Sequence, residues 1–274
     1  MNAAAADNAT VCFEDVRMGF GEGDVLQGIS FRVRQGETLV LLGEMGTGKS
    51  VTLKLAAGLL RPLSGRVRVL EHPVSEMRED ELLEFRRQIG FVFQEGALFD
   101  SLTVAENVAY RLREEHVDDE EVEERVREAL RFVELEHELE SLPSELSGGM
   151  RRRVSIARAL IGRPAVVLYD SPTAGLDPVT SQTIITLILR LRDVYGVTSL
   201  LATHRLQDGF ALANYRFDGS TGRVVAIARN GSASAASTSP QTRFAVLREG
   251  CVYFEGSPEE IAGAADPYLH KFLV

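Results

Sequence analysis

The stretch that decides the fold is Gly43-Glu44-Met45-Gly46-Thr47-Gly48-Lys49-Ser50. It fits the pattern G-x-x-x-x-G-K-[ST], in which glycines allow successive backbone N–H groups to surround a phosphate. Apolar residues 38–42 precede it, and an apolar pattern with helical spacing follows over residues 50–60. A strand, a glycine-rich loop and a helix in this order predict a phosphate site at the start of that helix.

The side chains of this loop predict a site for ATP and Mg²⁺. Lys49 is expected to reach the β- and γ-phosphates, and the Ser50 hydroxyl to ligate Mg²⁺. Asp170 is the second predicted magnesium ligand, because it follows residues 165–169, an apolar run typical of a strand buried on both faces. The predicted cofactor-binding residues of the loop are Gly43, Glu44, Met45, Gly46, Thr47, Gly48, Lys49, Ser50 and Val51.

The composition excludes several classes of protein. The 274 residues include two cysteines, Cys12 and Cys251, far apart, which rules out a disulfide framework or a four-cysteine zinc site. The first ten residues contain no Lys or Arg, which argues against a secretory signal, and no apolar run approaches the ~18 residues of a membrane span. The formal net charge of −10 argues against a nucleic-acid partner, and without a membrane span any membrane role must be peripheral.

The order of the patterns predicts an α/β fold. Asp177 and Pro178 are typical of the start of a helix, with Asp as N-cap and Pro in the first turn. The buried-strand pattern at 165–169 lies before this helix and a second one, at residues 198–203, lies after it. Strand, helix and strand in this order indicate a parallel sheet.

Two internal segments differ from this core. Residues 95–162, rich in Glu and Arg with helical spacing, predict a mostly helical subdomain between core segments 11–94 and 163–274 of a single domain. Residues 231–242 are of low complexity and predict a mobile loop. Strand-like residues flank them, at 224–228 and 244–247, and predict a long-tipped hairpin.

Leu146-Ser147-Gly148-Gly149-Met150 lies between the two nucleotide motifs and begins a helical pattern. It resembles the signature motif of ABC (ATP-binding cassette) ATPases. The resemblance covers nearly the whole chain and implies a P-loop NTPase with a RecA-like core, an antiparallel β subdomain and an inserted helical subdomain. It implies that Ser147, Gly148 and Gly149 face the γ-phosphate bound to the opposite subunit of a head-to-tail dimer.

The same resemblance assigns four further positions. Gln94, after the strand-like residues 89–93, is similar to the Q-loop glutamine that touches Mg²⁺ or water and senses the membrane partner. Asp177 is similar to the D-loop residue at the dimer interface, and His204 to the switch histidine that contacts the γ-phosphate. Phe20 matches the aromatic residue that stacks on adenine, with a core aromatic as the alternative.

A finer resemblance points to the cassettes of Mla/Mce-type lipid transporters. It rests on residues 91–104, on Met150 with the three arginines that follow it, and on residues 247–250 and 254–256. It implies phospholipid transport in a bacterium, with a second copy or a paralogous cassette, an integral membrane permease and a lipid-binding Mce-type subunit as partners. The chain would then lie in the cytoplasm, peripheral on the inner face of the membrane.

One position departs from the family pattern. Ser171 stands where these cassettes carry a glutamate that polarises the attacking water, and a hydroxyl is too weak a base for that role. Three hypotheses follow: a degenerate cassette paired with a competent one, slow hydrolysis in which His204 and Gln94 orient the water, or an introduced substitution that traps the ATP dimer. The alternatives in function are a non-transport ABC ATPase and a regulatory ATP-binding cassette without turnover.

Overall fold

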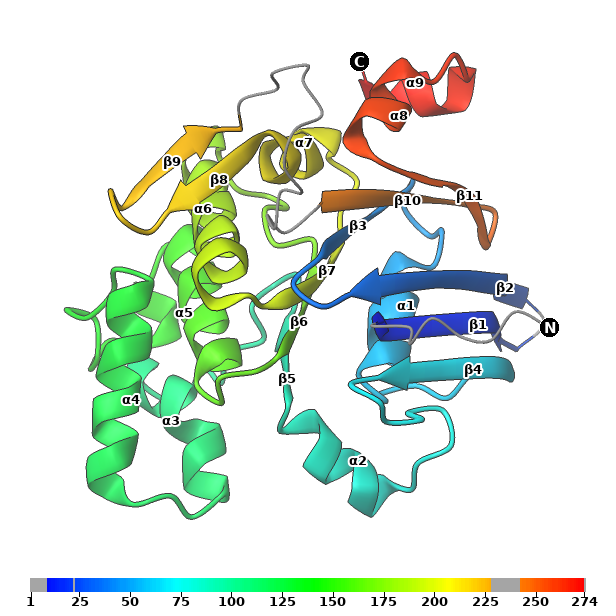
Figure 1. Ribbon diagram of the computed structural model, residues 1–274. Helices are drawn as coiled ribbons and strands as arrows, with labels where there is room; N and C mark the ends of the chain where they lie inside the picture. Colours follow the sequence, from blue (N-terminus) through cyan, green and yellow to red (C-terminus); the bar gives the residue numbers. More distant parts are fainter. Residues whose placement is uncertain (1–8, 22, 228–241, 274) are drawn as a thin grey trace.

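The computed structural model describes residues 9–21, 23–227 and 242–273 (Figure 1). A central six-stranded sheet has the order β11-β10-β3-β7-β6-β5, in which every pair is parallel except β10 with β11. The predicted α/β P-loop fold is confirmed. The strands of this sheet are β3 (Thr38–Leu42), β5 (Ile89–Val92), β6 (Val166–Asp170), β7 (Thr198–Ala202), β10 (Thr242–Arg248) and β11 (Cys251–Gly256).

A second, antiparallel sheet has the order β2-β1-β4 and packs on one side of the core (Figure 1). Its strands are β1 (Ala9–Phe20), β2 (Gly23–Arg34) and β4 (Ser64–Val69), and it shares a hydrophobic cluster with α1 (Lys49–Ala56) and α2 (Glu79–Arg86). Side chains of β3 alternate between two clusters: Leu39 and Leu41 face this one, whereas Val40 and Leu42 face the other. The strand before the phosphate loop is therefore buried on both faces.

Most of the remaining helices pack on the opposite side of the central sheet. Three of them, α3 (Val104–Glu114), α4 (Asp119–Phe132) and α5 (Gly148–Leu160), lie between β5 and β6 in the chain. Helix α4 ends at Phe132, and Glu134, two residues later, has a φ of 59°. The others are α6 (Pro178–Tyr195), α7 (Leu206–Asn214), α8 (Pro258–Gly263) and α9 (Pro267–Leu273), with a 3₁₀ turn at Pro143–Glu145.

The predicted hairpin around residues 231–242 is wrong. β9 (Arg223–Ala226) pairs with β8 (Tyr215–Asp218), while β10 pairs with β3 and β11. The reason is burial: β10 supplies Phe244 and Val246 to one core cluster and Ala245 and Leu247 to the other, so it belongs inside the large sheet. The predicted mobile loop lies, apart from Thr242, outside the described residues.

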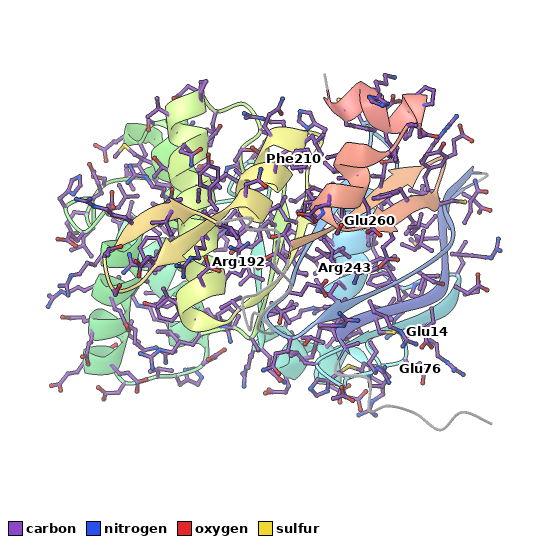
Figure 2. All side chains as sticks on the ribbon, turned by 45° about the horizontal axis from the view of Figure 1, so that its top comes forward. Glu14, Glu76, Arg192, Phe210, Arg243 and Glu260 are labelled. Carbon is purple, nitrogen blue, oxygen red and sulfur yellow. The ribbon has the colours of Figure 1, made fainter. Side chains whose placement is uncertain are left out.

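A buried arginine connects α6 with α7, β8 and β10. Arg192 of α6, labelled in Figure 2, donates hydrogen bonds to the carbonyls of Leu212 and Tyr215 and to Thr242 Oγ1. Its charge is balanced by the adjacent Asp193 at 2.7 Å. The guanidinium therefore fixes the end of α7, the start of β8 and the start of β10 relative to one helix.

Among the helices of the described residues, none has the length and apolar character needed to cross a bilayer.

Candidate nucleotide site

The candidate site lies at one edge of the central sheet. Strands β3, β7, β6 and β5 are neighbours in that order and run parallel, so their carboxyl ends share this edge. Gly43 directly follows β3, and Ser171 directly follows Asp170, the last residue of β6. One residue separates His204 from the end of β7, and one separates Gln94 from the end of β5. Open α/β sheets bind their ligands at this edge. Predicted residues spread over more than half of the chain are thus brought to one edge.

The phosphate loop connects β3 to α1 through backbone conformations that require glycine. Gly46 and Gly48 have φ values of 82° and 95°, in the left-handed region. A Cβ on Gly48 would lie 2.4 Å from Leu26 Cδ2, so a side chain is also excluded by packing. The loop delivers Lys49 as the first residue of α1, whose free N–H groups point toward the loop.

Lys49 is buried in the fold of the loop. Its ammonium donates to the carbonyl oxygens of Gly43, at 2.8 Å, and Glu44, at 2.6 Å. Burial lowers the pKa of Lys49, and the nearby Asp170 carboxylate partly offsets this effect. A positive charge held against backbone carbonyls, beside a helix N-terminus, is well placed to transfer its hydrogen bonds to phosphate oxygens.

Two of the predicted magnesium ligands, Ser50 and Asp170, are in direct contact. The Ser50 hydroxyl donates to Asp170 Oδ1 at 2.9 Å, although 120 residues separate them in the chain. A hydroxyl and a carboxylate are hard oxygen donors, and Mg²⁺ takes few protein ligands because phosphates and waters complete its octahedron. The residues present therefore fit Mg²⁺ bound together with a nucleotide phosphate.

Ser171 occupies a constrained position directly after Asp170. Its side chain is 9% exposed, its backbone N–H donates to the carbonyl of Ala202 in β7 at 2.8 Å, and its φ is 48°. A left-handed conformation costs a non-glycine residue about 1–2 kcal/mol, so the surrounding structure must impose it. The fold thus holds this residue at the sheet edge whatever its side chain.

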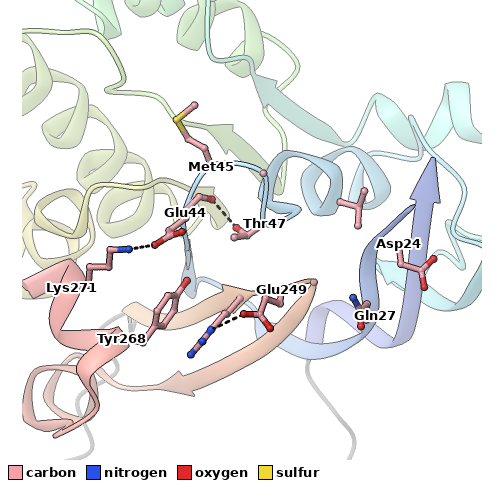
Figure 3. A pocket seen from close by; sticks show the side chains of 12 residues that line it. Asp24, Gln27, Glu44, Met45, Thr47, Glu249, Tyr268 and Lys271 are labelled. Carbon is pink, nitrogen blue, oxygen red and sulfur yellow. Dashed lines mark hydrogen bonds and ion pairs between the residues drawn. The ribbon is translucent and has the colours of Figure 1, made fainter. Parts of the chain in front are cut away.

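A cavity of about 550 Å³ lies beside the phosphate loop (Figure 3). Glu44, Met45, Gly46 and Thr47 line it from the loop side, together with residues of β2. Its opposite wall, which the sequence did not predict, comes from the C-terminal region: Arg248, Glu249, Gly250, Tyr268 and Lys271.

An ion pair connects this wall to the phosphate loop. Lys271 Nζ lies 2.5 Å from Glu44 Oε1, and this hydrogen bond lowers the pKa of the Glu44 carboxyl (Figure 3). Thr47 also contacts Glu44, since its hydroxyl donates to the Glu44 carbonyl at 2.9 Å. The phosphate loop is therefore held by Lys271 of α9 as well as by Lys49.

Phe20, the predicted adenine-stacking residue, ends β1 with 55% of its side chain exposed. Phe20 is not among the described residues that line the cavity, so it does not share that cavity with the phosphate loop. Such exposure does not fit the alternative of a core aromatic. Val51, by contrast, is half-buried in α1 and packs against the core under the loop.

The signature residues form the N-terminus of α5. Ser147 is the N-cap, and its hydroxyl accepts a hydrogen bond from the Met150 N–H at 3.2 Å. Gly148 is exposed, whereas Gly149 is buried against α6. None of the three is among the described residues lining the cavity beside the phosphate loop. An anion at this helix end would therefore not occupy that cavity.

The two glycines predict opposite effects of an added methyl group. A Cβ on Gly149 would lie 2.3 Å from Thr180 Cγ2, and the Thr180 hydroxyl is fixed by its hydrogen bond to Asp177. We expect Gly149→Ala to lower the free energy of unfolding by about 1–3 kcal/mol. Gly148→Ala, whose Cβ meets its nearest heavy atom at 3.8 Å, should be neutral or slightly stabilising. Urea unfolding followed by circular dichroism measures both, and equal stabilities would contradict the tight α5–α6 contact.

The remaining predicted residues are on the surface of the site. Gln94 and His204 are both exposed, next to the sheet edge. Asp177 is the N-cap of α6: it accepts hydrogen bonds from the N–H groups of Val179 and Thr180 and from the Thr180 hydroxyl, which is the main cause of its lowered pKa. In this chain alone, Asp177 therefore acts as a helix cap.

Comparison with known proteins identifies the family. The model of the ABC transporter family matches residues 26–174, which include the phosphate loop, the signature and Asp170. The chain belongs to the ABC transporter family. The cassette is 39% identical over 204 residues to the methionine import ATP-binding protein MetN of Rhizobium johnstonii, covering 74% of this chain and 56% of that protein.

Other relatives extend this picture. The cassette is 45% identical over 182 residues to Protein TRIGALACTOSYLDIACYLGLYCEROL 3, chloroplastic, of Arabidopsis thaliana, covering 64% of this chain and 52% of that protein. It spans about half the length of the curated relatives it matches.

Solved structures agree with the fold. The cassette MJ0796, in a dimeric post-hydrolysis state with ADP and Pi, aligns with a TM-score of 0.74 at 29% identity, covering 90% of this chain and 98% of that chain. The cbiO1 protein of Clostridium perfringens, part of the ABC transporter complex cbiONQ, aligns with a TM-score of 0.77 at 26% identity, covering 97% and 93%. The predicted membership of the family of ATP-binding cassettes is therefore confirmed.

Proposed function

We propose that the cassette binds Mg·ATP and drives an integral membrane permease. The observation that carries this proposal is the contact of Ser50 with Asp170 beside the buried Lys49 at one sheet edge, since these residues would serve as a magnesium pair and a phosphate-binding cation. The relatives named above as ATP-binding or as part of a transporter complex support it. Through the permease, the cassette would lie peripherally on the inner face of the membrane.

The signature favours a head-to-tail dimer with a second copy. Ser147 and Gly148 are exposed at the N-terminus of α5, outside the cavity beside the phosphate loop. A second molecule can present this helix end to the nucleotide, and dimeric MJ0796 with ADP and Pi supports such an arrangement. Gln94, His204 and Asp177 would then act at the shared nucleotide, as the family resemblance implies, and Phe20 would stack on the base.

The proposed dimer is testable through its dependence on the γ-phosphate. We expect the cassette to dimerise in Mg·ATP and to stay monomeric in Mg·ADP, measured by sedimentation velocity. Gly148→Arg should remove the dimer and leave nucleotide binding by the monomer intact, because Gly148 is exposed and an added Cβ meets its nearest heavy atom at 3.8 Å, so the bulky cation stands at the interface. A cassette that binds ATP but remains monomeric at every concentration tested would contradict dimerisation with a second copy.

The cargo has two candidates. The relatives named for methionine import favour methionine, and they do not support the Mla/Mce-type assignment or its Mce-type subunit. The Arabidopsis relative, whose name contains trigalactosyldiacylglycerol, is a specific observation in favour of a lipid. Deletion of the gene separates them: loss of radiolabelled methionine uptake supports the first, and normal uptake with an altered membrane lipid composition supports the second.

A further inference from the structure

The arginines of α5 donate hydrogen bonds to backbone carbonyls. Arg151 donates to the carbonyl of Leu146, the first residue of the signature, and Arg153 donates to Val133 O at 2.9 Å, after the end of α4. Arg152 donates to Phe93 O at 2.9 Å, and Arg158 donates to Gly96 O and Ala97 O at 2.8 and 2.7 Å. Arg152 and Arg158 thus bond to the same short segment, residues 93–97.

This segment contains Gln94 and is held on both sides of it. Phe93 O, before Gln94, accepts from Arg152 and from the Gly96 N–H, while the carbonyls of Gly96 and Ala97, after Gln94, accept from Arg158. The turn is tight, because Gly96 and Ala97 have φ values of 82° and 48°. The Gln94 side chain itself is exposed. The backbone is therefore fixed while the amide remains free to meet a ligand.

Arg152 is a buried cation with no role among those described so far for the nucleotide site. It is 6% exposed, and its Nε has no hydrogen-bond partner among the described residues. Burial lowers the pKa of its guanidinium, and the carboxylates of Glu95 and Asp170 are near enough to oppose that effect. Arg152 is therefore a buried cation that bonds to the residue before Gln94 and has the carboxylates of Glu95 and Asp170 nearby.

We propose that Arg152 and Arg158 are positioning residues that hold Gln94 in a fixed place relative to the signature helix, so that the cassette distinguishes ATP from ADP. The inference rests on the proposed function, because it needs Gln94 to act at the γ-phosphate end of the nucleotide. One helix, α5, carries the signature at its N-terminus and both arginines in its body. Gln94 and the signature therefore move as one unit when either meets the γ-phosphate.

The test compares the affinities for a non-hydrolysable ATP analogue and for ADP, each with Mg²⁺, by isothermal titration calorimetry. ADP shares the base and the β-phosphate with ATP, so the ratio of affinities isolates the γ-phosphate. We expect Arg152→Met to lower the analogue-to-ADP ratio about tenfold, the effect typical of losing a charge-assisted hydrogen bond. Arg152→Lys should recover part of the ratio, because an ammonium can still donate to one carbonyl.

Arg153→Met is the matched control. Arg153 belongs to the same helix and also donates to a carbonyl, but its acceptor, Val133 O, lies outside the held segment. Both variants should lower the melting temperature, while only Arg152→Met should change the ratio. If Arg152→Met does not fold, Arg152→Gln and Arg158→Met carry the same expectation.

A double-mutant cycle with Gln94→Ala decides whether Arg152 acts through Gln94. We expect the double variant to show the same ratio as Gln94→Ala alone. Ratios that fall by the product of the two single effects would overturn the proposal, as would an equal loss of affinity for both nucleotides in Arg152→Met. A wild-type cassette that binds neither nucleotide would instead contradict the proposed function itself.

Discussion

Steady-state hydrolysis of Mg·ATP is expected to rise by about 10²–10⁴-fold when Ser171 is replaced by glutamate. The position directly follows Asp170 at the sheet edge, and its backbone is already held by the hydrogen bond to Ala202 O. A carboxylate there can accept a proton from the attacking water, which the serine hydroxyl cannot do at neutral pH. The left-handed φ of 48° strains serine and glutamate alike, so the substitution should not unfold the cassette. Phosphate release by the purified full chain measures the effect.

Two variants bracket this result. Ser171→Gln supplies the length of glutamate without a base and should stay near the wild-type rate, and Lys49→Ala provides the blank. A wild-type rate far above that blank, with no gain in Ser171→Glu, would show that another group positions the water. The lack of a carboxylate at position 171 would then not limit the rate of hydrolysis. A wild-type rate equal to the blank favours a cassette that binds ATP without turnover or depends on a competent partner.

Nucleotide affinity is expected to fall by about 10²-fold or more in Lys49→Ala. The Lys49 ammonium is buried at the N-terminus of α1, where it donates hydrogen bonds to loop carbonyls. It can donate these hydrogen bonds to phosphate oxygens instead. Its removal takes away charge-assisted hydrogen bonds that no neighbouring cation of the loop replaces, since residues 43–50 contain one lysine and no arginine. Titration calorimetry with Mg·ADP measures binding without interference from hydrolysis.

Lys54 is the matched control for this variant. It lies in the same helix, is exposed, and is not among the residues that line the cavity. Lys54→Ala should bind Mg·ADP as the wild type does. Unchanged binding in Lys49→Ala would contradict the assignment of residues 43–50 as the phosphate site.

Local sequence was enough to predict the parts of the site that consist of short contiguous motifs. The phosphate loop needs glycines at positive φ, a lysine at a helix start and a buried strand before it, and each of these is visible in residues 38–50. The contact of Ser50 with Asp170 could be predicted because both follow buried strands of one parallel sheet. The cap of α6 by Asp177 was equally local.

The rest depends on which distant segments pack together. Whether the apolar strand β10 pairs with its chain neighbour or with β3 is decided by burial on both faces, and the hairpin prediction failed for that reason. The contact of Lys271 with Glu44 joins an ordinary surface lysine to the loop only through the position of α9. The arginines of α5 suggested a family resemblance, but their carbonyl acceptors in residues 93–97 have no signal in the sequence.

The position of β3 between β7 and β10 has a consequence for synthesis on the ribosome. Both of its neighbours come late in the chain, at Thr198–Ala202 and Thr242–Arg248. At about 5–20 residues per second, the backbone of β3 waits on the order of 10 s for its first partner. During that time an unpaired apolar strand is available to other nascent chains. The sheet that presents the phosphate loop is thus completed only after β10 has been synthesised, and termination before that point leaves an aggregation-prone intermediate instead of a smaller nucleotide-binding unit.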